Sequence, residues 1–263
     1  MRPRYLFAAL KNHLDPEQTL ALALGVRDAL QPTSPAVVGL SPSAAALAWV
    51  SGCRNRLALA AQNCGWSASY ALTGELSVRD LEVFCVRYCL VGHSERRLHL
   101  GETEAIIVAR LSALFAAQIM PILCVGETLA QRQEEATDTV LRRQLISLQA
   151  AFRKSAVAPD PTKLIIAYEP MWAISTSGSN QTAEPHDAVE VHGVIRQLLD
   201  ELFGPRFGAS TPVIFGGGLS ADNARDFLSQ PGVDGALVGG GMQTQAGFLG
   251  VLDAFYATLA AAG

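Results

Sequence analysis

Three side chains that can move or stabilise a proton each follow a short apolar run of the sequence: Lys11, His93 and Glu169. Lysine supplies a positive charge and a hydrogen-bond donor, and histidine can donate a proton or polarise a carbonyl group. Glutamate can act as a general base where a dry environment raises its pKa. Brought to one place, these three residue types would suit proton transfer beside a carbonyl group.

Two glycine-rich turns also follow apolar runs, at residues 216–218 and 239–241. Glycine lets backbone N–H groups approach an anion closely, and the start of a following helix adds positive potential. A tight turn also needs glycine for its own geometry, so one such turn would carry little weight. Two of them, after the last two apolar runs, indicate a phosphate site and therefore a phosphorylated small molecule as substrate.

The apolar runs that must position these candidates recur at fairly even intervals along the chain. Each run is too short for a helix and none alternates cleanly, so we interpret them as strands buried on both faces. Longer amphipathic stretches lie between them, as in parallel βαβ units. The runs are residues 5–10, 36–40, 57–61, 88–92, 120–125, 164–168, 212–215 and 235–238, and the helical stretches are 15–30, 102–117, 128–152, 187–202, 221–228 and 245–262.

Eight buried strands alternating with helices in 263 residues predict an α/β fold. They favour a closed (β/α)8 barrel of eight parallel strands over a doubly wound open sheet. No linker-like segment interrupts the pattern, so we expect residues 1–263 to form a single barrel domain. In such a barrel the catalytic residues lie at the C-terminal ends of the strands, where the three candidate side chains and both glycine turns stand.

Composition and charge argue against several partners. The net charge is −4 without any basic cluster, which argues against nucleic acid, and no apolar run approaches the ~18 residues of a membrane-spanning helix. The apolar run at the N-terminus is too short for a secretory signal. The sequence has five cysteines, an odd number, and no two of them form a Cys-x-x-Cys motif. We therefore expect a cytoplasmic protein with reduced cysteines and no zinc-like ligand cluster.

The sequence contains the motifs VGHSERR (91–97), CVGE (124–127), AYEPMWAI (167–174), TGE (73–75) and DGALVGGG (234–241). These five motifs resemble those of the triosephosphate isomerase family, in the family's order and at similar spacing. The resemblance implies a TIM barrel that interconverts dihydroxyacetone phosphate and D-glyceraldehyde 3-phosphate through an enediolate, without a metal or organic cofactor. It also implies a homodimer whose third loop inserts into the neighbour's active site, and residues 62–75, ending in Thr73-Gly74-Glu75, have that loop's length.

The resemblance also implies a role for each candidate residue. Glu169 would abstract a proton from the carbon beside the carbonyl and return it to the neighbouring carbon. His93, neutral because a helix starts directly after it, would polarise the carbonyl, and Lys11 would attract the phosphate and stabilise the enediolate. Glu95 would support the geometry of Lys11 and His93. The implied phosphate ligands are the backbone N–H groups of Ser175, Gly218, Gly239 and Gly240, and the implied lid is entered through Pro170, Met171 and Trp172 and continues through Ser177 and Gly178.

Three features at the substrate mouth depart from the family pattern. Ala9 stands where the family has a substrate-contacting asparagine, and Asn12 and His13 are candidates to compensate. The lid is three residues longer, and serines replace both of its hinge-side glycines. Phe215 and Gly218 replace a tyrosine and a serine whose hydroxyl groups latch the closed lid. Each lost hydrogen bond is typically worth about 0.5–1.5 kcal/mol.

These departures leave two alternatives open. One is a related isomerase of another short sugar phosphate, such as a tetrulose phosphate. The other is a non-catalytic relative that binds a phosphate ligand. The complete set of Lys11, His93 and Glu169 favours triosephosphate isomerase activity over both.

Overall fold

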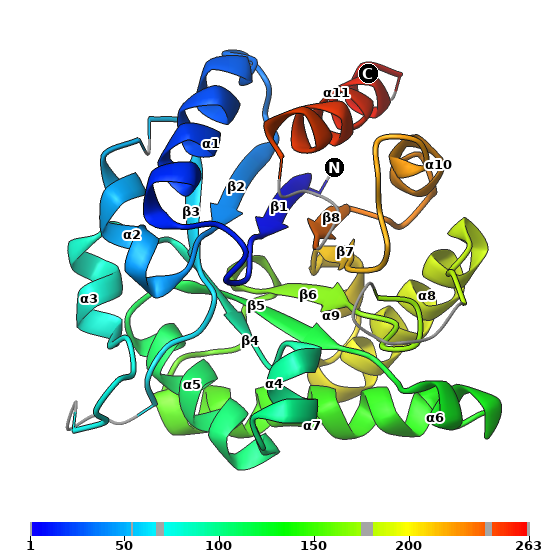
Figure 1. Ribbon diagram of the computed structural model, residues 1–263. Coiled ribbons are helices and arrows are strands. Elements are labelled where there is room, and N and C mark those ends of the chain that lie inside the picture. Colours follow the sequence, from blue (N-terminus) through cyan, green and yellow to red (C-terminus); the bar gives the residue numbers. More distant parts are fainter. Residues whose placement is uncertain (1, 54, 67–70, 175–180, 240–243, 262–263) are drawn as a thin grey trace.

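Eight parallel strands close into a barrel in chain order (Figure 1). The computed structural model describes residues 2–53, 55–66, 71–174, 181–239 and 244–261. The last strand pairs with the first, so that Tyr5 lies opposite Gly235 and Ala8 opposite Val238. The predicted (β/α)8 barrel is confirmed, and the open doubly wound sheet is wrong. The strands are β1 (Tyr5–Ala9), β2 (Val37–Ser41), β3 (Ala58–Ala61), β4 (Tyr88–Val91), β5 (Met120–Val125), β6 (Ile165–Tyr168), β7 (Val213–Phe215) and β8 (Gly235–Val238).

Helices surround the barrel, as Figure 1 shows. All six predicted helical stretches contain helix, but the stretch 128–152 is two helices. The first of them ends before Glu135, whose φ of 54° lies in the left-handed region and cannot continue a helix. The described helices are α1 (Pro16–Ala29), α2 (Ala44–Val50), α3 (Val78–Val83), α4 (Ser94–His99), α5 (Glu104–Ala116), α6 (Leu129–Gln133), α7 (Thr137–Ser155), α8 (Pro185–Phe203), α9 (Phe207–Ser210), α10 (Ala224–Leu228) and α11 (Gln245–Ala261).

Residues of each strand alternate between two apolar layers. In β1, Tyr5, Phe7 and Ala9 point into the barrel, while Leu6 and Ala8 belong to the layer between strands and helices. Because both faces are buried, the strand sequence shows no alternation of polar and apolar residues. The same alternation places the last inward-facing residue of β1, Ala9, directly at the mouth that holds the candidate site.

The outer layer contains a buried histidine, His192 of α8. Its side chain is 1% exposed and lies edge-on to the Tyr168 ring, with centroids 6.1 Å apart. Its Nδ1 lies 3.2 Å from the carbonyl oxygen of Gly232. Burial lowers the pKa of His192 to about 4. An unfolded histidine titrates near pH 6.5, so on acidification the unfolded chain takes up this proton before the folded chain does.

We expect this difference to make the protein less stable in acid. The contribution of His192 to the free energy of unfolding is fully present above about pH 6.5 and is lost as the pH falls through about 4. The full contribution is about 3 kcal/mol. Urea unfolding near pH 7, 5.5 and 4 should show a shallower loss for His192→Gln than for the wild type. An identical pH dependence of the two proteins would contradict this account.

Candidate active site

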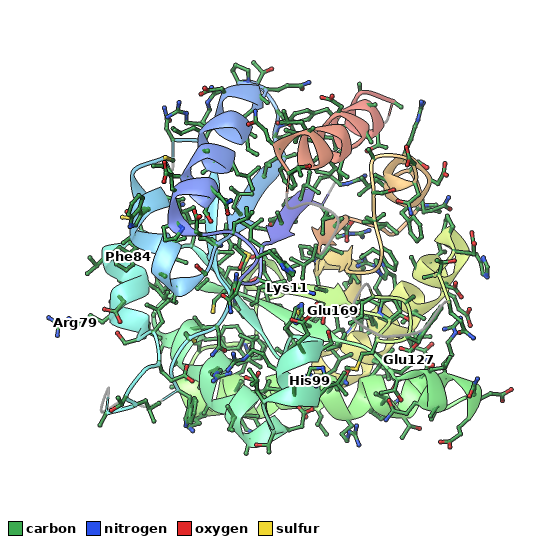
Figure 2. The ribbon with its side chains drawn as sticks, in the orientation of Figure 1. Lys11, Arg79, Phe84, His99, Glu127 and Glu169 are labelled. Carbon is green, nitrogen blue, oxygen red and sulfur yellow. The ribbon has the colours of Figure 1, made fainter. Side chains whose placement is uncertain are left out.

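The segments after β1, β4 and β6 bring Lys11, His93 and Glu169 to one cavity at the barrel mouth; Figure 2 labels Lys11 and Glu169 there. His93 Nε2 lies 3.2 Å from Glu169 Oε1. Lys11 Nζ donates a hydrogen bond of 2.6 Å to Glu95 Oε1. Residues separated by more than 150 positions in the sequence therefore form one constellation. The same cavity is also lined by Ala9, Ser94, Ile174, the glycine turn 216–218, Leu219, Leu237 and Gly239.

The carboxylate of Glu169 is held in a dry position. Its side chain is only 3% exposed, and the backbone N–H of Ser94 donates to Oε2 at 2.9 Å. The thiol of Cys124 lies beside it: burial, and next the charge of Glu169, raise the pKa of Cys124 well above its ordinary value. A carboxylate removed from water in this way is suited to act as a general base.

His93 is fixed by the first turn of α4, for which it is the N-cap residue. The backbone N–H of Glu95 donates to His93 Nδ1 at 3.4 Å, so Nδ1 acts as an acceptor. A neutral ring then carries its proton on Nε2, the nitrogen that faces Glu169. This arrangement suits a histidine that donates a hydrogen bond to a carbonyl oxygen.

The backbone of Lys11 has a φ of 50°, a left-handed conformation that is uncommon for a residue with a side chain. Gln62 stabilises it, because Nε2 of Gln62 donates to the carbonyl oxygens of Lys11 at 2.6 Å and Ser41 at 3.0 Å. The amide thereby joins the ends of β1, β2 and β3. This contact of Gln62 was not predicted from the sequence, because no motif indicates it and it forms only where the three strand ends meet.

The glycine turn after β7 is required by close packing. A Cβ atom on Gly217 would come within 2.2 Å of the Phe215 ring, and one on Gly216 within 2.9 Å of Glu169 Cγ. Phe215 is fully buried and stacks on Phe227 with centroids 4.5 Å apart, so it serves the core. Gly218 and Gly239 line the cavity. The other residues predicted for the phosphate site and the lid beyond residue 174 (Ser175, Ser177, Gly178 and Gly240) lie outside the described residues.

The entry to the lid, residues 170–172, is held by hydrogen bonds to Glu127, a fully buried residue. Trp172 Nε1 and the Tyr168 hydroxyl both donate to Glu127 Oε1, at 2.8 and 2.9 Å. The Met171 N–H donates to the carbonyl oxygen of Glu127 at 3.1 Å, and the Arg132 guanidinium lies 4.7 Å from the Trp172 ring centroid. Glu127 belongs to one of the quoted motifs, but the sequence did not reveal that it anchors the start of the lid.

The segment expected to reach a second subunit carries Thr73 on its exposed part. It is anchored by Arg110, a buried residue of α5 that pairs with Glu102. The Arg110 guanidinium lies 4.8 Å from the Trp66 ring centroid, and its Nη2 lies 3.6 Å from Glu75 Oε1. Residues on both sides of the segment's undescribed part, 67–70, are therefore fixed to the barrel.

A parallel barrel whose mouth holds a buried carboxylate facing an imidazole belongs to the class of acid–base enzymes built on the (β/α)8 fold. The family model described as triosephosphate isomerase matches residues 4–255. Curated relatives named triosephosphate isomerase include one from Chlorobium luteolum, 36% identical over 97% of this chain and 99% of its own. Another, from Rhodopirellula baltica, is 35% identical over 93% of this chain and 94% of its own. A third, from Herminiimonas arsenicoxydans, is 38% identical over 75% of this chain and 77% of its own.

The chain belongs to the triosephosphate isomerase family. The resemblance seen in the sequence is confirmed, and the protein is an isomerase. The comparisons contain nothing that favours either alternative. In the described part of the chain, no helix is long and apolar enough to cross a membrane.

Proposed function

We propose that this protein interconverts dihydroxyacetone phosphate and D-glyceraldehyde 3-phosphate by passing a proton through Glu169. The observation that supports this most is the 3.2 Å approach of Glu169 Oε1 to His93 Nε2 in a cavity that Lys11 also lines. An acid–base pair beside a positive charge is what proton transfer next to a carbonyl group needs.

In the proposed reaction, Glu169 removes a proton from the carbon beside the carbonyl. The electron pair of that C–H bond forms the double bond of an enediolate, and the carbonyl oxygen becomes negative. His93 donates the proton on Nε2 to this oxygen and takes up the proton of the neighbouring hydroxyl group, whose oxygen becomes the new carbonyl oxygen. The ammonium group of Lys11 stabilises the negative charge of the intermediate. Glu169 then returns its proton to the former carbonyl carbon. Glu95 keeps both groups in position, because its carboxylate accepts a hydrogen bond from Lys11 Nζ and its backbone N–H donates one to His93 Nδ1.

For the phosphate we propose the backbone N–H groups of Gly218 and Gly239, together with those of Ser175 and Gly240. Gly218 and Gly239 line the catalytic cavity after β7 and β8. Because glycine has no side chain to cover its backbone N–H group, this group can donate a hydrogen bond to a phosphate oxygen without help from a charged side chain. The proposed phosphate position is therefore the side of the cavity that follows β7 and β8.

The test is a coupled assay of glyceraldehyde 3-phosphate conversion by the purified wild type and by Lys11→Met. We expect the wild type to be active and the variant to lose about 10²–10³-fold in kcat/KM, because one electrostatic contact to the developing charge is removed. The matched control is Lys163→Met, an exposed lysine just before β6, at the other end of that strand from Glu169. Wild-type inactivity would refute the proposed activity. A Lys11 variant as active as the Lys163 variant would refute the role of Lys11.

We also propose a cytoplasmic homodimer built from one barrel domain per chain. Large apolar side chains are exposed on or directly after the helices that follow β2, β3 and β4, and an interface would bury them: Trp49 (55%), Val83 (71%), Leu98 (53%) and Leu100 (64%). The five cysteines are all free. Light scattering should give twice the chain mass of 27.9 kDa, and a single-chain mass at micromolar concentration would contradict the dimer.

The single domain and the location have their own tests. Limited proteolysis should leave one folded core, and cell fractionation should find the protein in the cytoplasm.

A further inference from the structure

The guanidinium group of Arg132, in α6, contacts residues on both sides of the implied lid. On the entry side it lies 4.7 Å from the Trp172 ring centroid, and its Nη1 lies 3.6 Å from Glu127 Oε1. On the far side its Nη2 donates a hydrogen bond to Asp187 Oδ1, in the first turn of α8. Neither Arg132 nor Asp187 belongs to the motifs that carry the family resemblance. One side chain therefore joins the turn that follows the base to the start of the next helix.

Asp187 fixes this contact to the backbone of α8. Its Oδ2 accepts a hydrogen bond of 2.8 Å from the backbone N–H of Glu184, which is the N-cap residue of the helix. Its Oδ1 accepts the bond from Arg132 and also lies 3.7 Å from Nε2 of the exposed residue His186. The Asp187 side chain itself is only 9% exposed. The same carboxylate thus caps α8 and holds the guanidinium group.

The position of the guanidinium group depends on two carboxylates that attract it from different sides. Glu127 is fully buried, and among the described residues Arg132 is the only cation within 4 Å of its carboxylate. A planar guanidinium group can meet one carboxylate with each terminal nitrogen, which a lysine ammonium group cannot do. Without the charge of Asp187, the attraction of Glu127 would act alone, and the guanidinium group would move across the Trp172 ring.

Such a movement would reach the base through very few residues. Only Pro170 and Met171 separate Glu169 from Trp172. The proline ring fixes one backbone dihedral of this turn, and the Met171 N–H donates to the Glu127 carbonyl oxygen at 3.1 Å. Because little backbone freedom is left, a displacement of Trp172 or Glu127 is transmitted to Glu169.

We propose that Arg132 and Asp187 are positioning residues for Glu169, and that their ion pair keeps the base at the place where it removes the proton. They contact no reacting atom and act through Trp172 and Glu127. This inference rests on the proposed function, because its expected effect falls on proton transfer by Glu169.

The test is Asp187→Asn, assayed on glyceraldehyde 3-phosphate. The amide oxygen can still accept the N–H of Glu184, so α8 keeps its cap while the charge is lost. We expect kcat to fall about tenfold and KM to change only a few fold, because a shift of about 1 Å in a catalytic group costs about 10²-fold and a smaller shift costs less. A residue that served stability alone would lower the urea midpoint and leave kcat of the folded enzyme unchanged.

The matched control is Asp138→Asn. Asp138 also stands in the first turn of a helix and faces an arginine, Arg142, at 3.7 Å, but both side chains are exposed. The substitution removes the same charge from an exposed ion pair, and such pairs contribute little. It should leave kcat and KM unaltered.

A double variant tests whether Asp187 acts through Arg132. Arg132→Gln should lower kcat about 10²-fold, because it also withdraws the contacts to Glu127 and Trp172. Adding Asp187→Asn to this variant should cause no further loss. Two effects that multiply in full would show that the residues act independently and would overturn the inference.

The remaining outcomes are equally decisive. An inactive wild type would refute the proposed function and this inference with it. An active wild type together with an Asp187→Asn variant of unchanged kcat would overturn the inference alone. If Asp187→Asn does not fold, Arg132→Lys takes its place: it keeps a positive charge without the planar fork, so kcat should fall at least about tenfold. Wild-type kcat in that variant would overturn the inference as well.

Discussion

Replacing Glu169 by glutamine is expected to lower kcat on triose phosphates by about 10³-fold and to change KM only a few fold. The amide has the shape of the carboxylate, and its oxygen can still accept the hydrogen bond from the Ser94 N–H, but it cannot take a proton. The loss should therefore fall on the chemical step. Steady-state kinetics measure both constants, and urea unfolding checks that the variant is folded.

The matched control for this substitution is Glu134→Gln, on an exposed residue at the end of α6. It makes the same chemical change far from the cavity and should leave both constants unaltered. If Glu169→Gln kept kcat within tenfold of the wild type, the base of the reaction would have to be another group.

The second large effect is expected for Gly126→Ala, a substitution of a residue that is not itself proposed to touch substrate. A Cβ atom on Gly126 would come within 1.8 Å of the carbonyl oxygen of Glu169, so the strand end that carries the base must move. We expect a loss of about 1–3 kcal/mol or more in unfolding free energy. We also expect kcat/KM to fall on the order of 10²-fold, because a shift of about 1 Å in a catalytic group has that effect.

Gly193→Ala is the control that separates local crowding from the loss of any glycine. Gly193 lies within α8, and a Cβ atom there would meet nothing within 4 Å. Alanine in the middle of a helix should raise stability by roughly 0.5–1 kcal/mol and leave activity unchanged. A Gly126 variant with full activity would show that the position of the Glu169 backbone is not critical.

The barrel and the location of its candidate site were predictable from the sequence because both depend on local patterns. Short apolar runs separated by helical stretches imply buried parallel strands, and the C-terminal ends of such strands meet at one mouth. Lys11, His93 and Glu169 each stand directly after such a run, so their proximity followed from the fold.

What the sequence did not reveal depends on contacts between distant segments. Gln62 holds the Lys11 backbone only because three strand ends converge, and the link from Trp172 to Glu127 spans 45 positions. Helices such as α2 and α3 were not predicted, because six or seven residues are too few to establish a helical period.

The measurement that tests the central claim most directly is isomerisation of dihydroxyacetone phosphate in D₂O, followed by NMR of the product. If Glu169 carries the proton, its carboxyl group exchanges with solvent, and glyceraldehyde 3-phosphate should form with deuterium at carbon 2 in at least part of the molecules. Deuterium should enter at that carbon only. Product formed at the full rate with no deuterium at all would indicate a direct shift of hydrogen between the two carbons and would contradict a mechanism that passes through Glu169.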